Sequence, residues 1–144
     1  MPQRLVSQVI EDQEIVTVAP NSSVIEAVRA MKQRRIGALM VVEGSRLVGI
    51  LSERDVVFRV VADGLDAQST RVADVMTRNP VTIQPDKPFG HALHIMYEGG
   101  FRHVPVVDAD GRAVGMVSAR DALDLEEHEF EEALKQREHI RVIL

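Results

Sequence analysis

The sequence predicts an α+β fold made of two copies of one unit, and three observations support this fold class. Short segments recur at a fixed offset, as when VTVAP at 16–20 returns as VTIQP at 81–85. Each copy alternates β-branched runs with apolar residues at helical spacing. Each copy also ends on nearly the same segment, LVGILSERD at 47–55 and AVGMVSARD at 113–121. A repeat of this length sets the architecture and governs every later assignment.

Both copies predict the order strand-helix-strand-strand-helix. The first strand is rich in β-branched residues and is expected at 15–18 and again at 80–83. Two strands joined by a short Gly-containing turn then predict a hairpin in each copy. The hairpin strands are expected at 38–43 and 46–52 in the first copy and at 103–108 and 113–118 in the second.

The helices are predicted from apolar stripes at i, i+3, i+4, i+7. Asn21 or Ser22 can cap the first helix. Its stripe is Val24, Ala27, Val28 and Met31, and the second copy repeats it with Phe89, Ala92, Leu93 and Met96. The Gly99-Gly100 pair is expected to end that second helix as a C-cap. The helix after each Ser-x-Arg-Asp is expected to place apolar residues on one face, namely Val56, Val57, Val60 and Val61, then Ala122, Leu123 and Leu125.

A unit of this size cannot bury both sheet faces and both helices alone, so the two copies are expected to pack sheet to sheet around a pseudo-twofold axis. This packing creates two equivalent clefts, and the Ser-x-Arg-Asp segments at the strand ends are placed to line them. The chain divides into a first repeat at 5–64, a linker and lead-in helix at 65–79, a second repeat at 80–126, and an acidic tail at 127–144.

Composition excludes several classes of function. The net charge is −5 and the basic residues are scattered, which argues against nucleic-acid binding. There is no cysteine, so disulfides, thiolate nucleophiles and Cys-ligated metals are excluded. No apolar run has the length of a signal peptide or a membrane span, so we expect a soluble cytoplasmic protein. The sequence shows no recognisable nucleophile–base pair, so an enzyme is not expected. His91 and His94 lack a third ligand, so a metal site is not expected either.

The repeated Ser-x-Arg-Asp segment has two interpretations. Ser followed three residues later by Asp forms a capping box at a helix start. The same helix start favours a phosphate, through its free amides and dipole, and an Asp one turn in can accept both hydroxyls of a ribose. Arg54 and Arg120 add planar donors for phosphate oxygens. The motif alone leaves both interpretations open.

A family resemblance rests on the repeated segments above, on DVMTRNPVTI at 74–83 and on GGFRHVPVVDADGRAVGMVSARD at 99–121. The chain resembles tandem cystathionine-β-synthase (CBS) domains that form a Bateman module. The resemblance covers about residues 5–126. It implies a regulatory module without catalytic activity that binds adenosine nucleotides (AMP, ADP or ATP) between the repeats, often as a homodimer. It implies no other cofactor.

The resemblance also implies roles for individual residues. Asp55 and Asp121 would hold ribose hydroxyls, and Ser52 and Ser118 would bind phosphate or the nearby sugar. Thr17 and Thr82 would sit at the base or phosphate end of a cleft. Arg102 and His103 would reach the phosphate, ahead of the strand that contains Pro105, and Arg54 and Arg120 would close the same region. In the first copy Gly37 and Ala38 replace Arg102 and His103, so the two clefts are expected to bind unequally.

The tail at 127–144 departs from the repeat as an acidic helix with an apolar end, which we expect to support the homodimer. A different function also fits the residues: a ligand-free dimerisation or scaffold module in which both Ser-x-Arg-Asp segments only cap helices. Binding of adenosine nucleotides would separate the two.

Overall fold

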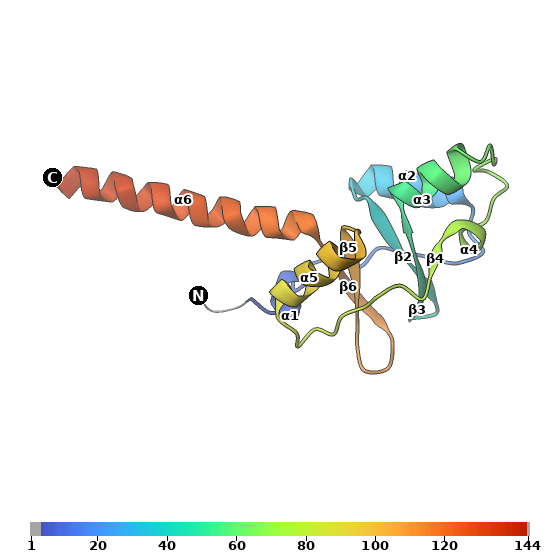
Figure 1. Cartoon of the computed structure of the whole chain (residues 1–144), viewed down its shortest axis with the longest axis horizontal. Coiled ribbons are helices and arrows are strands. Elements are labelled where there is room, and N and C mark those ends of the chain that lie inside the picture. The colour runs from blue at the N-terminus through green and yellow to red at the C-terminus, as the bar shows by residue number, and fades with distance from the viewer. Residues whose placement is uncertain (1–3, 144) are drawn as a thin grey trace.

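The structure is a computed structural model that describes residues 4–143, with side-chain surroundings up to residue 138. Its helices and strands form two bodies of similar build, and a long C-terminal helix leads away from the second (Figure 1). Each body contains the predicted hairpin and its preceding helix. The predicted α+β fold with two repeats is therefore confirmed.

The first body is built on a four-stranded sheet in which β1 runs parallel to β2 and the other neighbours are antiparallel. In sheet order its strands are β1 (Thr17–Val18), β2 (Ala38–Glu43), β3 (Arg46–Ser52) and β4 (Thr77–Arg78). Its helices are α2 (Val24–Arg34), α3 (Glu53–Val56), which continues as a π-helical turn at Val57–Val61, and α4 (Val72–Val75).

The second body is built on an antiparallel hairpin. Its strands are β5 (His103–Val107) and β6 (Ala113–Ser118), and its helices are α1 (Val6–Val9), α5 (Phe89–Gly99) and α6 (Ala119–Ile143). The hairpins of the two bodies join at their turns, where Leu47 N–H donates to the Gly111 carbonyl at 3.1 Å and Ala113 N–H donates to the Ser45 carbonyl at 3.0 Å.

The apolar stripes predicted for α2 and α5 face the cores of their bodies. The predicted N-cap of α2 was wrong by one or two residues, because Ser23 Oγ accepts the Glu26 N–H at 3.3 Å in place of Asn21 or Ser22. Gly100 ends α5 with φ 71°, which confirms the predicted C-cap. Arg35 occupies the equivalent left-handed position after α2, with φ 55°.

The first strand predicted for the second copy was wrong at 80–83. It is reduced to one parallel bridge, in which Ile83 N–H donates to the Pro105 carbonyl and Val107 N–H donates to the Ile83 carbonyl, both at 3.0 Å. The next bond of a parallel ladder would need a donor at Pro105, which has no N–H. Met40 stands at this position in the first copy, and there β1 pairs with β2 over two residues.

The helix after the first Ser-x-Arg-Asp does not bury its whole predicted apolar face. Val60 is buried, whereas Val57 and Val61 are exposed together with Phe58 and Leu65. After the second motif Ala122 and Leu125 are half-buried, and Leu123 is exposed. The predicted burial was therefore wrong for these exposed residues within the described part of the chain, because none of its elements packs over that face.

A short lead-in helix precedes each copy, α1 before the first and α4 before the second, and each packs on the body formed mainly by the other copy. Val6 of α1 is buried against Ile83 and Phe89 in the second core, and its N–H donates to the Lys87 carbonyl at 2.9 Å. Val72 of α4 is buried in the first core, and its N–H donates to the Ser22 carbonyl at 2.9 Å. The repeat boundaries at 5–64 and 80–126 remain expectations from the sequence, and in space each core is completed by the lead-in of the other copy. Among the described residues, no helix combines the length and the apolar character that crossing a bilayer requires.

Candidate ligand-binding clefts

Two clefts lie between the bodies, and we name each after its aspartate. The Asp55 cleft has a volume of about 670 Å³. The start of α3 forms one wall, and the segment after α4 and the end of α5 form the others. Its lining residues are Gly37, Ile50, Ser52, Glu53, Arg54, Asp55, Phe58, Thr77, Asn79, Pro80, Val81, Gly99, Gly100, Phe101, Arg102 and His103.

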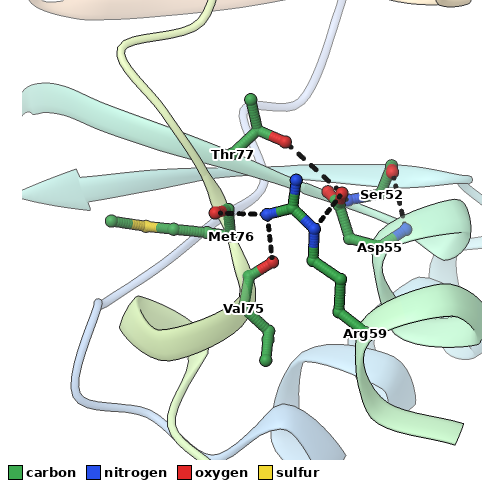
Figure 2. Close-up of polar contacts among 6 residues, drawn as sticks. All are labelled: Ser52, Asp55, Arg59, Val75, Met76 and Thr77. Atoms are coloured by element: carbon green, nitrogen blue, oxygen red, sulfur yellow. Dashed lines mark hydrogen bonds and ion pairs between the residues drawn. The ribbon is translucent and has the colours of Figure 1, made fainter. Parts of the chain in front are cut away.

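The capping box of α3 holds the Asp55 carboxylate at the cleft wall (Figure 2). Ser52 N–H donates to Asp55 Oδ2 at 2.9 Å, and Asp55 N–H donates to Ser52 Oγ at 3.1 Å. The Thr77 hydroxyl donates to Asp55 Oδ1 at 3.3 Å. The side chain of Asp55 is 12% exposed, so its orientation is fixed before any ligand arrives.

Arg59 secures the same corner from the π-helical turn (Figure 2). Its Nη1 donates to the carbonyls of Val75 and Met76 at 3.2 and 3.1 Å, and its Nε lies 3.9 Å from Asp55 Oδ1. Arg59 thereby ties the π-helical turn after α3 to the segment that leads from α4 into β4. The position of the Asp55 carboxylate depends on both segments.

The Asp121 cleft is its counterpart across the pseudo-twofold axis, with a volume of about 860 Å³. The start of α6 forms one wall, and the segment before β1 and the end of α2 form the others. Its lining residues are Gln13, Glu14, Val16, Arg35, Ile36, Gly37, Ala38, Met40, Glu53, Arg102, His103, Met116, Ser118, Ala119, Arg120, Asp121 and Leu123.

Asp121 is held by fewer groups than Asp55. Ser118 N–H donates to Asp121 Oδ2 at 2.7 Å, and the Ser118 hydroxyl donates to the same oxygen at 3.4 Å. Glu11 and Leu125 occupy the sequence positions that correspond to Thr77 and Arg59. The second copy therefore has neither the hydroxyl nor the guanidinium that orients Asp55.

The two clefts share a central wall made of Gly37, Glu53, Arg102 and His103. A Cβ at Gly37 would lie 3.2 Å from Glu53 Oε1 and 3.4 Å from His103 Cε1, so glycine allows these two side chains to approach. Burial lowers the pKa of His103 below its ordinary value of 6.5, an effect that Arg102 adds to and that Glu53 and Asp121 oppose. His103 is thus a titratable group between the clefts.

The structure brings most of the sequence-predicted residues into the clefts. Ser52, Arg54 and Asp55 line one cleft, and Ala38, Ser118, Arg120 and Asp121 line the other, while Gly37, Arg102 and His103 line both. The prediction that the first copy lacks the basic residues of the second was incomplete. Arg35 from the first repeat also lines the Asp121 cleft, so that cleft receives arginines from both repeats.

Thr17, Thr82 and Pro105 line neither cleft. Thr17 and Thr82 point away from the clefts because successive residues of extended backbone point to opposite faces. Val16 and Val81, one residue earlier, are the ones that line the clefts. Pro105 is fully buried in β5.

Sequence reasoning missed Thr77, Glu53 and Arg35. Thr77 follows α4 in the segment DVMT, and only the exchange of lead-ins brings it to Asp55. Glu53 aligns with Ala119, and Arg35 aligns with Gly100, so a search for residues shared by both copies overlooks both charges. Charged residues without a counterpart in the other repeat were the available signal.

The arrangement suits a small ligand that combines hydroxyl groups, a flat apolar ring and an anionic end. A carboxylate fixed at a helix start accepts hydroxyls, and the apolar lining of the Asp55 cleft can take a flat ring. Arg54 stacks on Phe58, with its guanidinium carbon 5.4 Å from the ring centroid, and together with Arg102 it offers donors for an anion. Within residues 4–138 no three His, Asp or Glu side chains group as metal ligands would.

Comparisons with known proteins agree with the architecture. The family model of the CBS domain matches residues 6–62 and again 72–128. The CBS domain-containing protein CBSCBSPB1 of Arabidopsis thaliana is 36% identical over 107 residues, which are 74% of this chain and 20% of that protein. The chain therefore spans about a fifth of the length of this relative.

Two solved structures with bound ligands share the fold. The CBS domain protein PAE2072 from Pyrobaculum aerophilum, complexed with AMP, is 26% identical with a TM-score of 0.75, over 82% of this chain and 89% of that one. The CBS domain pair of protein MJ0100, in complex with 5-methylthioadenosine and S-adenosyl-L-methionine, is 29% identical with a TM-score of 0.80, over 89% and 99%. The chain belongs to the CBS domain family and carries two CBS domains in tandem.

Proposed function

We propose that this chain is a non-catalytic regulatory module that binds an adenosine nucleotide in the Asp55 cleft. One observation carries the proposal: a single cleft combines a carboxylate held at a helix start, an apolar lining, and basic side chains from the opposite repeat. AMP, ADP and ATP all present the matching groups, namely ribose hydroxyls, a flat base and phosphate.

Each group of the ligand has a proposed partner. The ribose hydroxyls donate to Asp55, whose carboxylate is oriented by Ser52 and Thr77. The adenine ring lies between the apolar side chains that line the cleft. The phosphate receives donors from Arg102 and from the ring N–H of His103. Because these donors belong to the second repeat and Asp55 to the first, the ligand bridges the two repeats.

The Asp121 cleft is proposed as a second, weaker site. Its aspartate lacks the orienting contacts of Asp55. Its lining also contains Glu14, which pairs with Arg34, in addition to the Glu53 that both clefts share. Arg35 and Arg120 supply the donors that balance this charge. A phosphate in either cleft draws on Arg102 and His103, so filling one cleft lowers the affinity of the other for an anionic ligand.

The ligands of similar proteins support the class of ligand. AMP is bound by PAE2072, and 5-methylthioadenosine and S-adenosyl-L-methionine are bound by the MJ0100 pair. All three contain an adenosine moiety, which is the part that Asp55 and the apolar lining are proposed to recognise.

Regulation is proposed to act through a cytoplasmic homodimer and a regulated partner protein. Val57, Phe58, Val61 and Leu65 are exposed apolar residues in and just after the π-helical turn, and we infer that they form a patch. A ligand that binds one arrangement of the repeats more tightly shifts the population of arrangements, and this patch transmits the shift.

A thermal-shift panel of AMP, ADP, ATP, NAD(H) and S-adenosylmethionine tests the proposal. Stabilisation by at least one adenosine ligand, and none by ribose 5-phosphate alone, is the expected result, because binding to the folded state raises its stability. A folded protein that no member of the panel stabilises contradicts the proposal. Such a result would favour a scaffold module, for which the exposed patch around Phe58 is the supporting observation.

A further inference from the structure

Helix α6 is 25 residues long, and only its beginning packs against the second body (Figure 1). From Glu126 to Glu138 every residue is exposed. Leu123 and Phe130 are each 64% exposed, and Leu134 is 43% exposed. Isolated helices are marginal in water, and most helical stability in proteins comes from packing an apolar face. Helix α6 therefore presents a face that the rest of the described chain leaves unpacked.

The charges on α6 are divided along its length. Between 124 and 132 there are acidic residues and no Lys or Arg, whereas Lys135 and Arg137 follow in the next turns. Glu127 and Glu131 are four residues apart, so their like charges oppose the helix. Only a weak ion pair, between His128 Nε2 and Glu132 Oε1 at 3.3 Å, offsets charge within this segment. The acidic half of the helix lacks a cationic partner within the described part of the chain.

We propose that α6 pairs with α6 of a second copy in antiparallel orientation. A parallel pair would place acidic segment beside acidic segment. An antiparallel pair places the acidic segment of each copy beside the Lys135–Arg137 segment of the other. The second copy thus supplies the charge that α6 itself lacks.

The sequence spacing defines a register for this pair. Leu123, Phe130 and Arg137 recur every seven residues, with Glu126 and Ala133 between them, so these five positions form one seam. When Phe130 faces Ala133 of the second copy, Glu126 faces Arg137 of the second copy. The twofold axis then passes between 131 and 132, and both charged residues of the seam are paired.

The pairing specifies the proposed homodimer but does not depend on nucleotide binding. A protein that stays monomeric at all concentrations overturns both the dimer and the pairing. A dimer whose α6 helices lie apart overturns the pairing alone. Loss of nucleotide binding, as expected for Asp55→Ala, leaves the pairing intact.

Spin-label distances within the full-length dimer test the orientation. The chain has no cysteine, so Asp124→Cys, Glu131→Cys and Glu138→Cys each place one label on the same outer face of α6. With a rise of about 1.5 Å per residue, antiparallel pairing displaces labels at 124 and at 138 by about 20 Å along the axis, and labels at 131 by almost nothing. The expected result is a short distance at 131 and longer ones at both other sites. Equal distances at all three sites, or long distances at 131, contradict the proposal.

A charge exchange tests the register. Glu126→Arg and Arg137→Glu are each expected to reduce the population with the short distance at 131. The double variant, which restores opposite charges across the seam, is expected to recover it. Glu132→Arg makes the same change of charge outside the seam and serves as the control. Equal loss in the control, or no recovery in the double variant, contradicts this register.

Discussion

At the scale of single residues, the clefts depend on side chains that one copy has and the other lacks. Glu53 has Ala119 as its counterpart, and Arg102 has Gly37. The shared Ser-x-Arg-Asp chemistry and the unmatched Arg102 were identified from the sequence, but Glu53 was not. Glu53 and Arg102 meet at the central wall because the repeats pack against one another.

His103 gives this wall a dependence on pH. Because the pKa of His103 is lower in the folded protein than in the unfolded chain, the unfolded chain binds this proton more readily, and the free energy of unfolding decreases as the pH falls from 6.5 toward the lowered pKa. Comparing the wild type with His103→Gln in urea unfolding between about pH 5 and pH 8 isolates the effect. The free energy of unfolding of the wild type relative to the variant should rise with pH up to about 6.5 and then level off. A relative stability that falls with pH would contradict this environment for His103.

Arg35 combines a strained left-handed backbone with a charged side chain that lines the Asp121 cleft. Its left-handed backbone costs an arginine about 1–2 kcal/mol, and glycine avoids this cost but loses more entropy on folding. Arg35→Gly is therefore expected to raise the free energy of unfolding by up to about 1 kcal/mol while weakening anion binding in the Asp121 cleft only. Lys32→Gly, inside α2, is the control and should destabilise by about 1 kcal/mol. Destabilisation by Arg35→Gly would show that its side chain has contacts that outweigh the strain.

At the scale of elements, the helices and hairpins were predictable because their periodicities are local. The apolar stripes of α2 and α5 and the four hairpin strands lie where the sequence pattern put them. The strand at 80–83 failed because its partner Pro105 offers no donor, a property of the neighbouring strand. The hydrogen bond from Thr77 to Asp55 likewise depends on the packing of the second copy's lead-in on the first body. Local sequence patterns do not reveal this packing.

The exchange of lead-ins makes a prediction about where stability is lost. Val6→Ala removes buried methyl groups from the second core and is expected to cost about 1–3 kcal/mol. Hydrogen exchange should then increase in β5 and β6, although residue 6 lies far from them in the sequence. The equivalent Val72→Ala should increase exchange in β2 and β3. Faster exchange confined to β2 and β3 in the Val6 variant would contradict the exchange of lead-ins.

At the scale of the whole molecule, the two repeats form one unit with two unequal clefts. Each cleft takes its aspartate from one repeat and is lined by residues of both, and each core takes a lead-in from the other copy. The pseudo-twofold arrangement was predictable from the repeat alone. The difference between the clefts follows from Thr77 and Arg59, which orient Asp55 and have no equivalents in the second copy.

Calorimetric titration of AMP into the wild type, Asp55→Ala and Asp121→Ala tests the central proposal most directly. The wild type is expected to bind at two unequal sites, Asp55→Ala to lose the tighter one, and Asp121→Ala to lose the weaker one. Each variant should remain folded at a cost of about 0.5–2 kcal/mol, the range for a lost helix cap. Unchanged binding in both folded variants, or two identical sites in the wild type, would contradict the account.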